Sequence, residues 1–146
     1  MKIAVRYQTR GGNTKEAAEA IAKAAGVKAE PIYVAIREPI DLLFIGGGVY
    51  TFDIDRSLKE FIKTIDNDIV KSVAIFTTSG FISVTNKIIT AAQAKNIKVI
   101  EHSLTLRLGW RRAGQSKKKG NRFLNDKQLK SINDFVTRST IAWKHI

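Results

Sequence analysis

The stretch that decides how this chain is arranged is Thr9-Arg10-Gly11-Gly12-Asn13-Thr14. It follows the apolar run Ile3-Ala4-Val5 and precedes an alanine-rich segment, 15–25, whose apolar residues recur at helical spacing. A strand, a glycine loop and a helix start are therefore expected in immediate succession. Such a junction attracts anions, because the first N–H groups of a helix are unpaired and its N-terminal dipole is positive. Glycine also lets the backbone come close to a ligand.

Two interpretations of this loop remain open when it is considered alone. The short side chains of Thr9, Asn13 and Thr14 can reach phosphate oxygens, so the loop can hold a phosphate group. Asn and Thr are also good helix N-caps, so the loop can equally be a tight turn with a cap. Its spacing matches neither G-x-G-x-x-G nor the P-loop.

Composition limits the classes of protein to which the chain can belong. With 146 residues, of which 44% are apolar, we expect residues 1–146 to form a single globular domain. The absence of cysteine excludes disulfides, thiolate metal sites and thiol catalysis, and two histidines are too few for a histidine metal cluster. The sequence has no apolar run near the ~20 residues that span a membrane and no secretory signal at its start. We therefore expect a cytoplasmic protein without a membrane partner.

The chain is strongly basic, with 25 Lys and Arg against 13 Asp and Glu and a net charge of +12. This balance concerns partners rather than fold, and it favours acidic proteins, nucleic acid or anionic cofactors. Part of the excess is concentrated without an offsetting acid in the segment 107–122, at Arg107, Arg111, Arg112, Lys117, Lys118, Lys119 and Arg122.

Hydrophobic patterns along the chain alternate between strand and helix. The expected strands are 2–7, 27–35, 41–46, 72–77 and 98–106, and the expected helices are 13–25, 55–65, 83–95 and 126–143. This alternation predicts an α/β fold, a doubly wound parallel sheet with helices on both faces. The connection 36–40 is too short for a full crossover helix, so the second helix is expected to be shortened or missing.

Smaller features carry expectations of their own. Asp55 or Asp53 is expected to cap the helix that begins near residue 55, Asn125 to cap the last helix, and Gly26 to end the first. Arg6 stands in a strand that should be buried, so we expect it to point beyond a sheet edge. Arg10 has two open roles, either strengthening a phosphate site or beginning a positive surface that selects a partner.

Three of the expected loops leave the same edge of the sheet. In an open parallel sheet, ligands bind beyond the carboxyl ends of the strands. The loops 9–14, 46–53 and 77–81 all leave that edge, and all mix glycine with hydroxyl residues. The second and third also carry aromatic residues, among them Tyr50 and Phe81, which offer a stacking face. Together the loops predict a site for a planar, phosphorylated ligand.

These loops resemble those of the flavodoxin-like family, and the resemblance covers nearly the whole chain. The family's phosphate loop has the form Ser/Thr-x-Thr-Gly-x-Thr, which Thr9-Arg10-Gly11-Gly12-Asn13-Thr14 resembles with Gly11 in place of the central Thr. The resemblance implies that Thr9, Gly12, Asn13 and Thr14 bind the phosphate of FMN, with Arg10 and Gly11 contributing through the backbone. It also implies a five-stranded sheet in the order 2-1-3-4-5.

The same resemblance implies the residues around the flavin ring. From the second loop these are Gly47, Gly48, Val49, Tyr50 and Thr51, with Tyr50 beside the ring. From the third loop they are Thr78, Ser79, Gly80 and Phe81.

The function that this resemblance implies is electron transfer by bound FMN, which cycles between oxidised and reduced forms. The redox partner of so basic a protein is expected to carry an acidic surface. Two alternatives remain open. One is a cofactor-free module of the same fold that binds an acidic protein or nucleic acid through the segment 107–122. The other is a small FMN-dependent reductase of quinone-type substrates.

Overall fold

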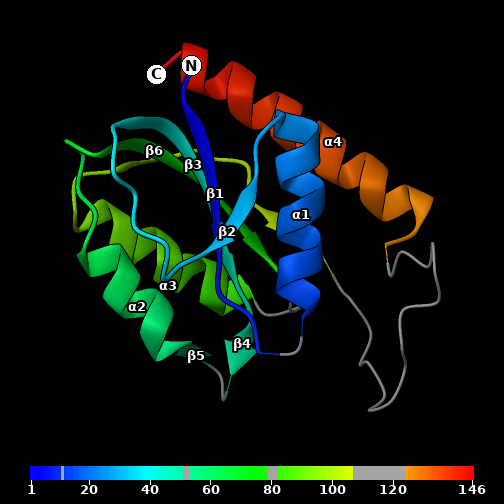
Figure 1. Ribbon diagram of the computed structural model, residues 1–146, viewed down its shortest axis with the longest axis horizontal. Helices are drawn as coiled ribbons and strands as arrows, with labels where there is room; N and C mark the ends of the chain where they lie inside the picture. Colours follow the sequence, from blue (N-terminus) through cyan, green and yellow to red (C-terminus); the bar gives the residue numbers. More distant parts are fainter. Residues whose placement is uncertain (11, 51–52, 79–81, 107–123) are drawn as a thin grey trace.

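The computed structural model describes residues 1–10, 12–50, 53–78, 82–106 and 124–146. A parallel sheet lies between helices on both of its faces (Figure 1). Its strands are β1 (Ile3–Tyr7), β2 (Ala29–Pro31), β3 (Ile40–Gly47), β6 (Val70–Thr77), β7 (Lys98–Val99) and β8 (Leu104–Thr105). The helices are α1 (Asn13–Ala25), α2 (Arg56–Lys63), α3 (Ile82–Gln93) and α4 (Asp126–Lys144), and a separate hairpin joins β4 (Val49–Tyr50) to β5 (Asp53–Ile54).

The strand order is β2-β1-β3-β6-β7, with β8 also pairing with β6, and all of these pairings are parallel. The predicted doubly wound sheet in the order 2-1-3-4-5 is therefore confirmed. β3 and β6 occupy the centre because their side chains are apolar on both faces, as a strand covered by helices on each side requires. The alternation along β3 divides the core, since Leu42 and Phe44 pack with α1 and α4 whereas Leu43 and Ile45 pack with α2 and α3.

Two predicted strands are shorter than expected, for local reasons. Segment 27–35 contributes only β2, because the Val27 N–H is bonded to the Ala22 carbonyl in the cap of α1, where Gly26 has a φ of 75°. At its other end a turn begins, in which the Val34 N–H donates to the Pro31 carbonyl. Segment 98–106 is split into β7 and β8, because residues 101–103 are exposed and leave the sheet.

No helix forms between β2 and β3, where residues 32–39 contain only turns and irregular backbone. Arg6 points from β1 towards this edge, but it is only 7% exposed. Its Nε donates to the Val34 carbonyl at 2.9 Å, and its Nη2 lies 3.2 Å from Glu30 Oε2. Burial lowers the pKa of Arg6, and the Glu30 carboxylate partly offsets that effect. A buried guanidinium therefore supports the segment that replaces the crossover helix.

The caps predicted for α2 and α4 are confirmed. Asp55 caps α2, and Asn125 caps α4 in a capping box in which Asn125 Oδ1 accepts from the Gln128 N–H at 2.8 Å. No helix in the described parts of the chain is both long and apolar enough to cross a bilayer.

Candidate functional site

The candidate site is the edge of the sheet at which β1, β3 and β6 end. The strand register places Tyr7 beside Gly46 and Gly47 beside Thr77, so the loops that follow these strands start next to one another. Figure 1 shows the start of α1 and the β4–β5 hairpin at this same end of the molecule. Parallel pairing thus brings together residues that are far apart in the sequence.

The first loop leads into α1 without a side-chain cap. Gly12 occupies the N-cap position with a φ of 88°, a left-handed conformation that glycine adopts without strain. The Thr9 hydroxyl accepts from the Gly12 N–H at 2.9 Å and so closes the loop on itself. Since no side chain in the described part of the chain caps the helix, the N–H groups of its first turn, which begins at Asn13, face the loop as a site for an anion.

A hydroxyl pair ties the first loop to the third. Thr14, which is 2% exposed, shares a hydrogen bond of 2.9 Å between its Oγ1 and that of Thr78. A hydroxyl has one donor and two acceptor sites, so whichever of the two hydroxyls accepts in this bond keeps its own O–H to donate to a ligand oxygen. The start of α1 and the loop after β6 are therefore held at a fixed separation.

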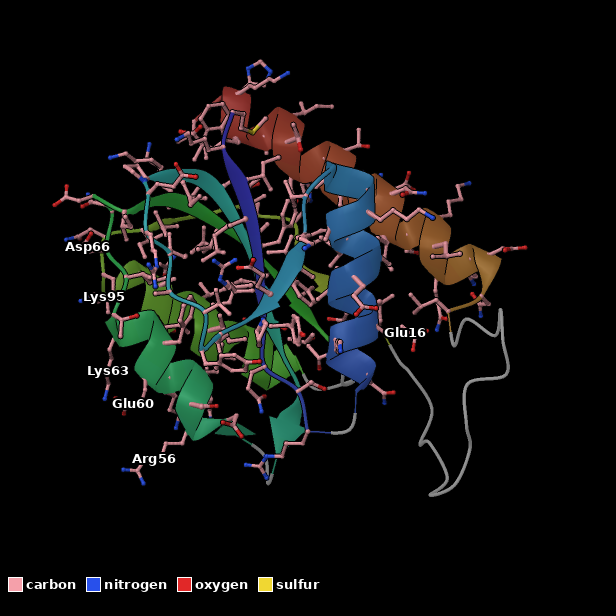
Figure 2. All side chains as sticks on the ribbon, viewed as in Figure 1. Glu16, Arg56, Glu60, Lys63, Asp66 and Lys95 are labelled. Atoms are coloured by element: carbon pink, nitrogen blue, oxygen red, sulfur yellow. The ribbon has the colours of Figure 1, made fainter. Side chains whose placement is uncertain are left out.

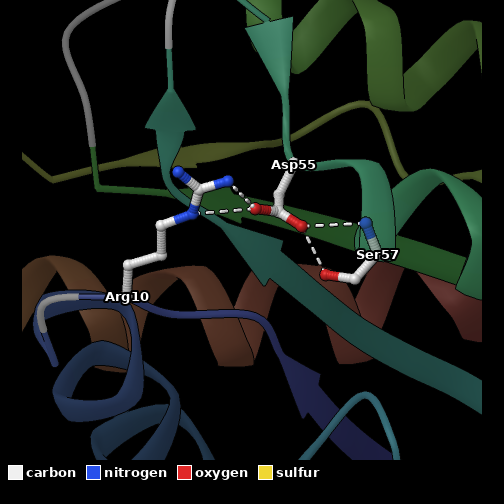
Figure 3. Close-up of polar contacts among 3 residues, drawn as sticks. All are labelled: Arg10, Asp55 and Ser57. Carbon is white, nitrogen blue, oxygen red and sulfur yellow. Dashed lines mark hydrogen bonds and ion pairs between the residues drawn. The ribbon is translucent and has the colours of Figure 1, made fainter.

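Arg10 ties the first loop to α2 (Figure 3). Its Nε and Nη2 lie 3.0 and 2.7 Å from Asp55 Oδ2. The other carboxylate oxygen of Asp55 accepts from the Ser57 N–H at 2.8 Å and from the Ser57 hydroxyl. One carboxylate thus caps α2 and binds the arginine of the first loop.

The environment of Asp55 keeps its carboxylate ionised. Burial alone would raise the pKa of this group, but the hydrogen bonds from Ser57 and the guanidinium of Arg10 outweigh that effect and lower it. Part of the positive charge of Arg10 is correspondingly balanced. Both roles that the sequence left open for this arginine treat it as a source of positive charge, whereas the structure adds a mechanical one, the link between the first loop and α2.

The second loop begins on glycines that are packed too tightly for a side chain. A Cβ on Gly46 would lie 2.2 Å from Phe76 Cε2, and one on Gly47 would lie 2.7 Å from Leu58 Cδ2. Gln8 lies close by, 8% exposed, and its buried Oε1 has no hydrogen-bond partner among the described residues. Sequence reasoning missed Gln8, because a polar residue at a strand end is ordinarily exposed.

Of the predicted site residues, the structure describes Thr9, Arg10, Gly12, Asn13, Thr14, Gly47, Gly48 and Thr78. Hydrogen bonds join Thr9 to Gly12 and Thr14 to Thr78, and the strand register sets Gly47 beside the residue that precedes Thr78. For Val49 and Tyr50 only the backbone is described, in a hairpin that pairs Tyr50 with Asp53. That hairpin was not expected, because the sequence lacks the Asn-Gly or Asp-Gly turn that usually signals one. Gly11, Thr51, Ser79, Gly80, Phe81 and the basic segment 107–122 lie outside the described residues.

Comparisons with known proteins agree with this architecture. The family model described as "Flavodoxin domain" matches residues 4–134. A flavodoxin from the domain Archaea has a similar structure, with a TM-score of 0.74, 18% sequence identity, and coverage of 99% of this chain and 100% of that one. A search of the curated proteins finds no match.

Two further solved structures show the same fold. Oxidised Flavodoxin 2 from Bacillus cereus is 13% identical, with a TM-score of 0.68 and coverage of 97% of this chain and 99% of that one. A flavodoxin, WrbA-like protein from Agrobacterium tumefaciens is 15% identical, with a TM-score of 0.68 and full coverage of both chains, 100% each. At these identities the likeness concerns the fold.

Proposed function

Because this chain belongs to the flavodoxin domain family, we propose that it is an FMN-binding electron-transfer protein. The observation that carries the proposal is the junction of β1 with α1. There an uncapped helix start, a glycine in the left-handed conformation and two threonine hydroxyls converge at the edge where three loops meet.

The residues of this junction fit a phosphate group. Gly12 presents backbone without a Cβ, and the first turn of α1 presents N–H groups and the positive end of the helix dipole. Thr9 and Thr14 add hydroxyls, and Thr78 holds Thr14 in place. We assign the phosphate of FMN to Thr9, Gly12, Asn13 and Thr14, with Arg10 and Gly11 contributing through the backbone.

The ring of FMN is assigned to the other two loops. Tyr50 would stack beside it, Gly47, Gly48, Val49 and Thr51 would provide backbone contacts, and Thr78, Ser79, Gly80 and Phe81 would flank its other side. When bound, FMN supplies the redox chemistry, whereas the protein orients the ring and limits its exposure to water. This assignment is supported by the place of the two loops, which leave the sheet side by side because Gly47 pairs with Thr77.

The electron-transfer partner is proposed to be a protein with an acidic surface. With a net charge of +12, the protein attracts anionic partners over long range, so association should slow as salt is added. Neutralising Lys117, Lys118 and Lys119 should weaken partner association and leave FMN affinity unchanged. Under the cofactor-free alternative the same variant would lose its only activity.

Flavin titration tests the assignment of the phosphate. The purified protein should be yellow or should take up added FMN, with quenching of flavin fluorescence. Thr14→Val should weaken FMN binding by about 10- to 150-fold, since a hydrogen bond to a charged group contributes about 1.5–3 kcal/mol.

The matched control is Thr140→Val, which removes a hydroxyl that donates to the Val136 carbonyl on α4. It should leave FMN affinity unchanged. A colourless protein that fails to take up added FMN would refute the proposal.

A further inference from the structure

A second surface of the protein lies away from the proposed FMN site, in a groove between α2 and α3. These two helices pack on the same face of the sheet, and the groove between them has a volume of about 590 Å³. That volume lies within the range of ~300–1,000 Å³ found for ordinary binding pockets. None of the residues assigned to FMN lines the described part of the groove.

The rim of this groove is cationic. Among the described residues that line it are Lys59 and Lys63 from α2, together with Lys87 and Lys95 from α3 and the turn that follows it, and none of the lining residues is acidic. Figure 2 shows Lys63 and Lys95 on the same side of the molecule. Lys63 also lies 3.4 Å from Glu60 on its own helix, a pair exposed enough to be exchanged at little cost.

The floor of the groove is apolar and formed by small or recessed side chains. Ile62 is 2% exposed, and Ala91 and Ala94 line the α3 side. Because alanine is short, an apolar side chain from a partner can approach the α3 backbone closely here. The groove therefore combines an apolar centre with positive charge along both sides.

We propose that this groove docks a short, acidic, amphipathic helix of a partner protein. Such a helix lays apolar residues spaced three and four positions apart into a groove of this kind. Its flanking Asp and Glu side chains would then meet the lysines on either side. This inference goes beyond the proposed function, and it does not depend on FMN, because the groove and the FMN site share no described residue.

The composition of the groove favours a peptide over other anionic partners. Binding of single-stranded nucleic acid usually combines basic groups with aromatic or arginine stacking, and the described lining of the groove contains neither residue type. A membrane surface needs protruding apolar side chains, whereas Ile62 is recessed between two helices. An apolar strip between two rows of lysines matches the pattern of an acidic amphipathic helix.

The opposite side of α2 would discriminate against the same partner. There, beside the segment that replaces the crossover helix, lies an apolar groove of about 970 Å³ whose described lining includes one cation, Arg56, and the carboxylates of Glu60 and Asp66. These carboxylates repel an acidic helix, so the two sides of α2 differ in charge although both are apolar at their centres. Repulsion of this kind confers specificity as effectively as new attraction does.

Fluorescence anisotropy with a defined peptide tests the proposal. The probe is a labelled 16-residue helix with leucine at positions i, i+3, i+4 and i+7 and glutamate on its flanks. Lys63→Glu/Lys95→Glu should weaken its binding by about tenfold. The control Lys127→Glu/Lys130→Glu, on α4 across the sheet, makes the same change in net charge and should weaken binding less than about twofold.

Four further measurements make the outcome decisive. Amide chemical shifts should change at Ile62 and Ala91 when the peptide is added, and a peptide with serine in place of leucine should not bind. FMN uptake should be the same in both charge variants, and thermal unfolding should show both folded at the assay temperature, which separates a failure here from a failure of the proposed function. Equal weakening by the two variants, shifts elsewhere, or lysine-dependent binding of duplex DNA or anionic vesicles without peptide binding would overturn the proposal.

Discussion

The ion pair between Arg10 and Asp55 should make a measurable contribution to stability, separable from the helix cap that shares its carboxylate. Asp55→Asn keeps a side-chain oxygen that can accept from the Ser57 N–H, because Asn and Asp are equivalent N-caps, but it removes the negative charge that faces Arg10. Asp55→Ala removes both the cap and the charge. The two variants therefore divide the roles of one side chain.

The expected magnitudes follow from exposure and geometry. Arg10 is 61% exposed and Asp55 is 8% exposed, so the pair is partly screened by solvent and should contribute about 0.5–1 kcal/mol. Loss of an N-cap costs about 1 kcal/mol more. Asp55→Asn should thus lower the free energy of unfolding by about 0.5–1 kcal/mol and Asp55→Ala by about 1.5–2 kcal/mol.

Urea unfolding followed by circular dichroism at pH 7 measures both values. A double-mutant cycle with Arg10→Ala isolates the ion pair, because Arg10→Ala and Asp55→Asn should be less than additive when combined. The pKa of Asp55 is lowered in the folded state, so its contribution is fully present above the ordinary value of about 3.9. The difference between wild type and Asp55→Asn should shrink as the pH falls below about 4.

Two results would refute this reasoning. Full additivity of Arg10→Ala and Asp55→Asn at low salt would mean that the two side chains do not interact in solution. A stability difference that grows as the pH falls below 4 would contradict the lowered pKa of Asp55.

Other predictions concern packing and capping. Gly46→Ala places a Cβ 2.2 Å from the ring of Phe76 and should lower the free energy of unfolding in urea by about 1–3 kcal/mol, whereas an unchanged midpoint would contradict the packing. Arg6→Met removes the donors to the segment that replaces the crossover helix; it should cost about 1.5–3 kcal/mol and speed amide exchange at 32–36 more than elsewhere. Asn125→Ala should cost about 1 kcal/mol in thermal unfolding and should fray only the start of α4, an outcome that local amide exchange checks.

Most of the architecture was accessible from local sequence patterns. The apolar runs that became β3 and β6, the alanine stripe of α1 and the caps at Asp55 and Asn125 act through neighbouring residues, so their periodicity and side-chain chemistry predict them. The lengths of the edge strands could not be predicted from these local patterns. The residues that follow Val27 were expected to form a strand with it, but the Val27 N–H donates to the cap of α1 and so does not join the sheet.

The candidate site was likewise only partly predictable from local sequence. The residues Thr9 to Thr14 could be selected from their sequence alone, because an anion site at a helix start needs glycine, hydroxyls and a helical pattern within a few positions. Their partners could not be selected, because Thr78 reaches Thr14 across 64 positions and Asp55 reaches Arg10 across 45. Contacts over such distances depend on the register of the sheet and on the packing of α2.

Sequence alone therefore determined the order of strands and helices, the excess of positive charge and the loop suited to a phosphate, all of which depend on composition or on near neighbours. Only the tertiary structure decided that Arg10 is bound to the cap of α2, that Arg6 is buried beneath a segment without a helix, and that four lysines from α2, α3 and the turn after α3 border one apolar groove. The physical reason is that burial and charge pairing depend on which surfaces meet in space, and the parallel sheet brings those surfaces together from separate parts of the chain.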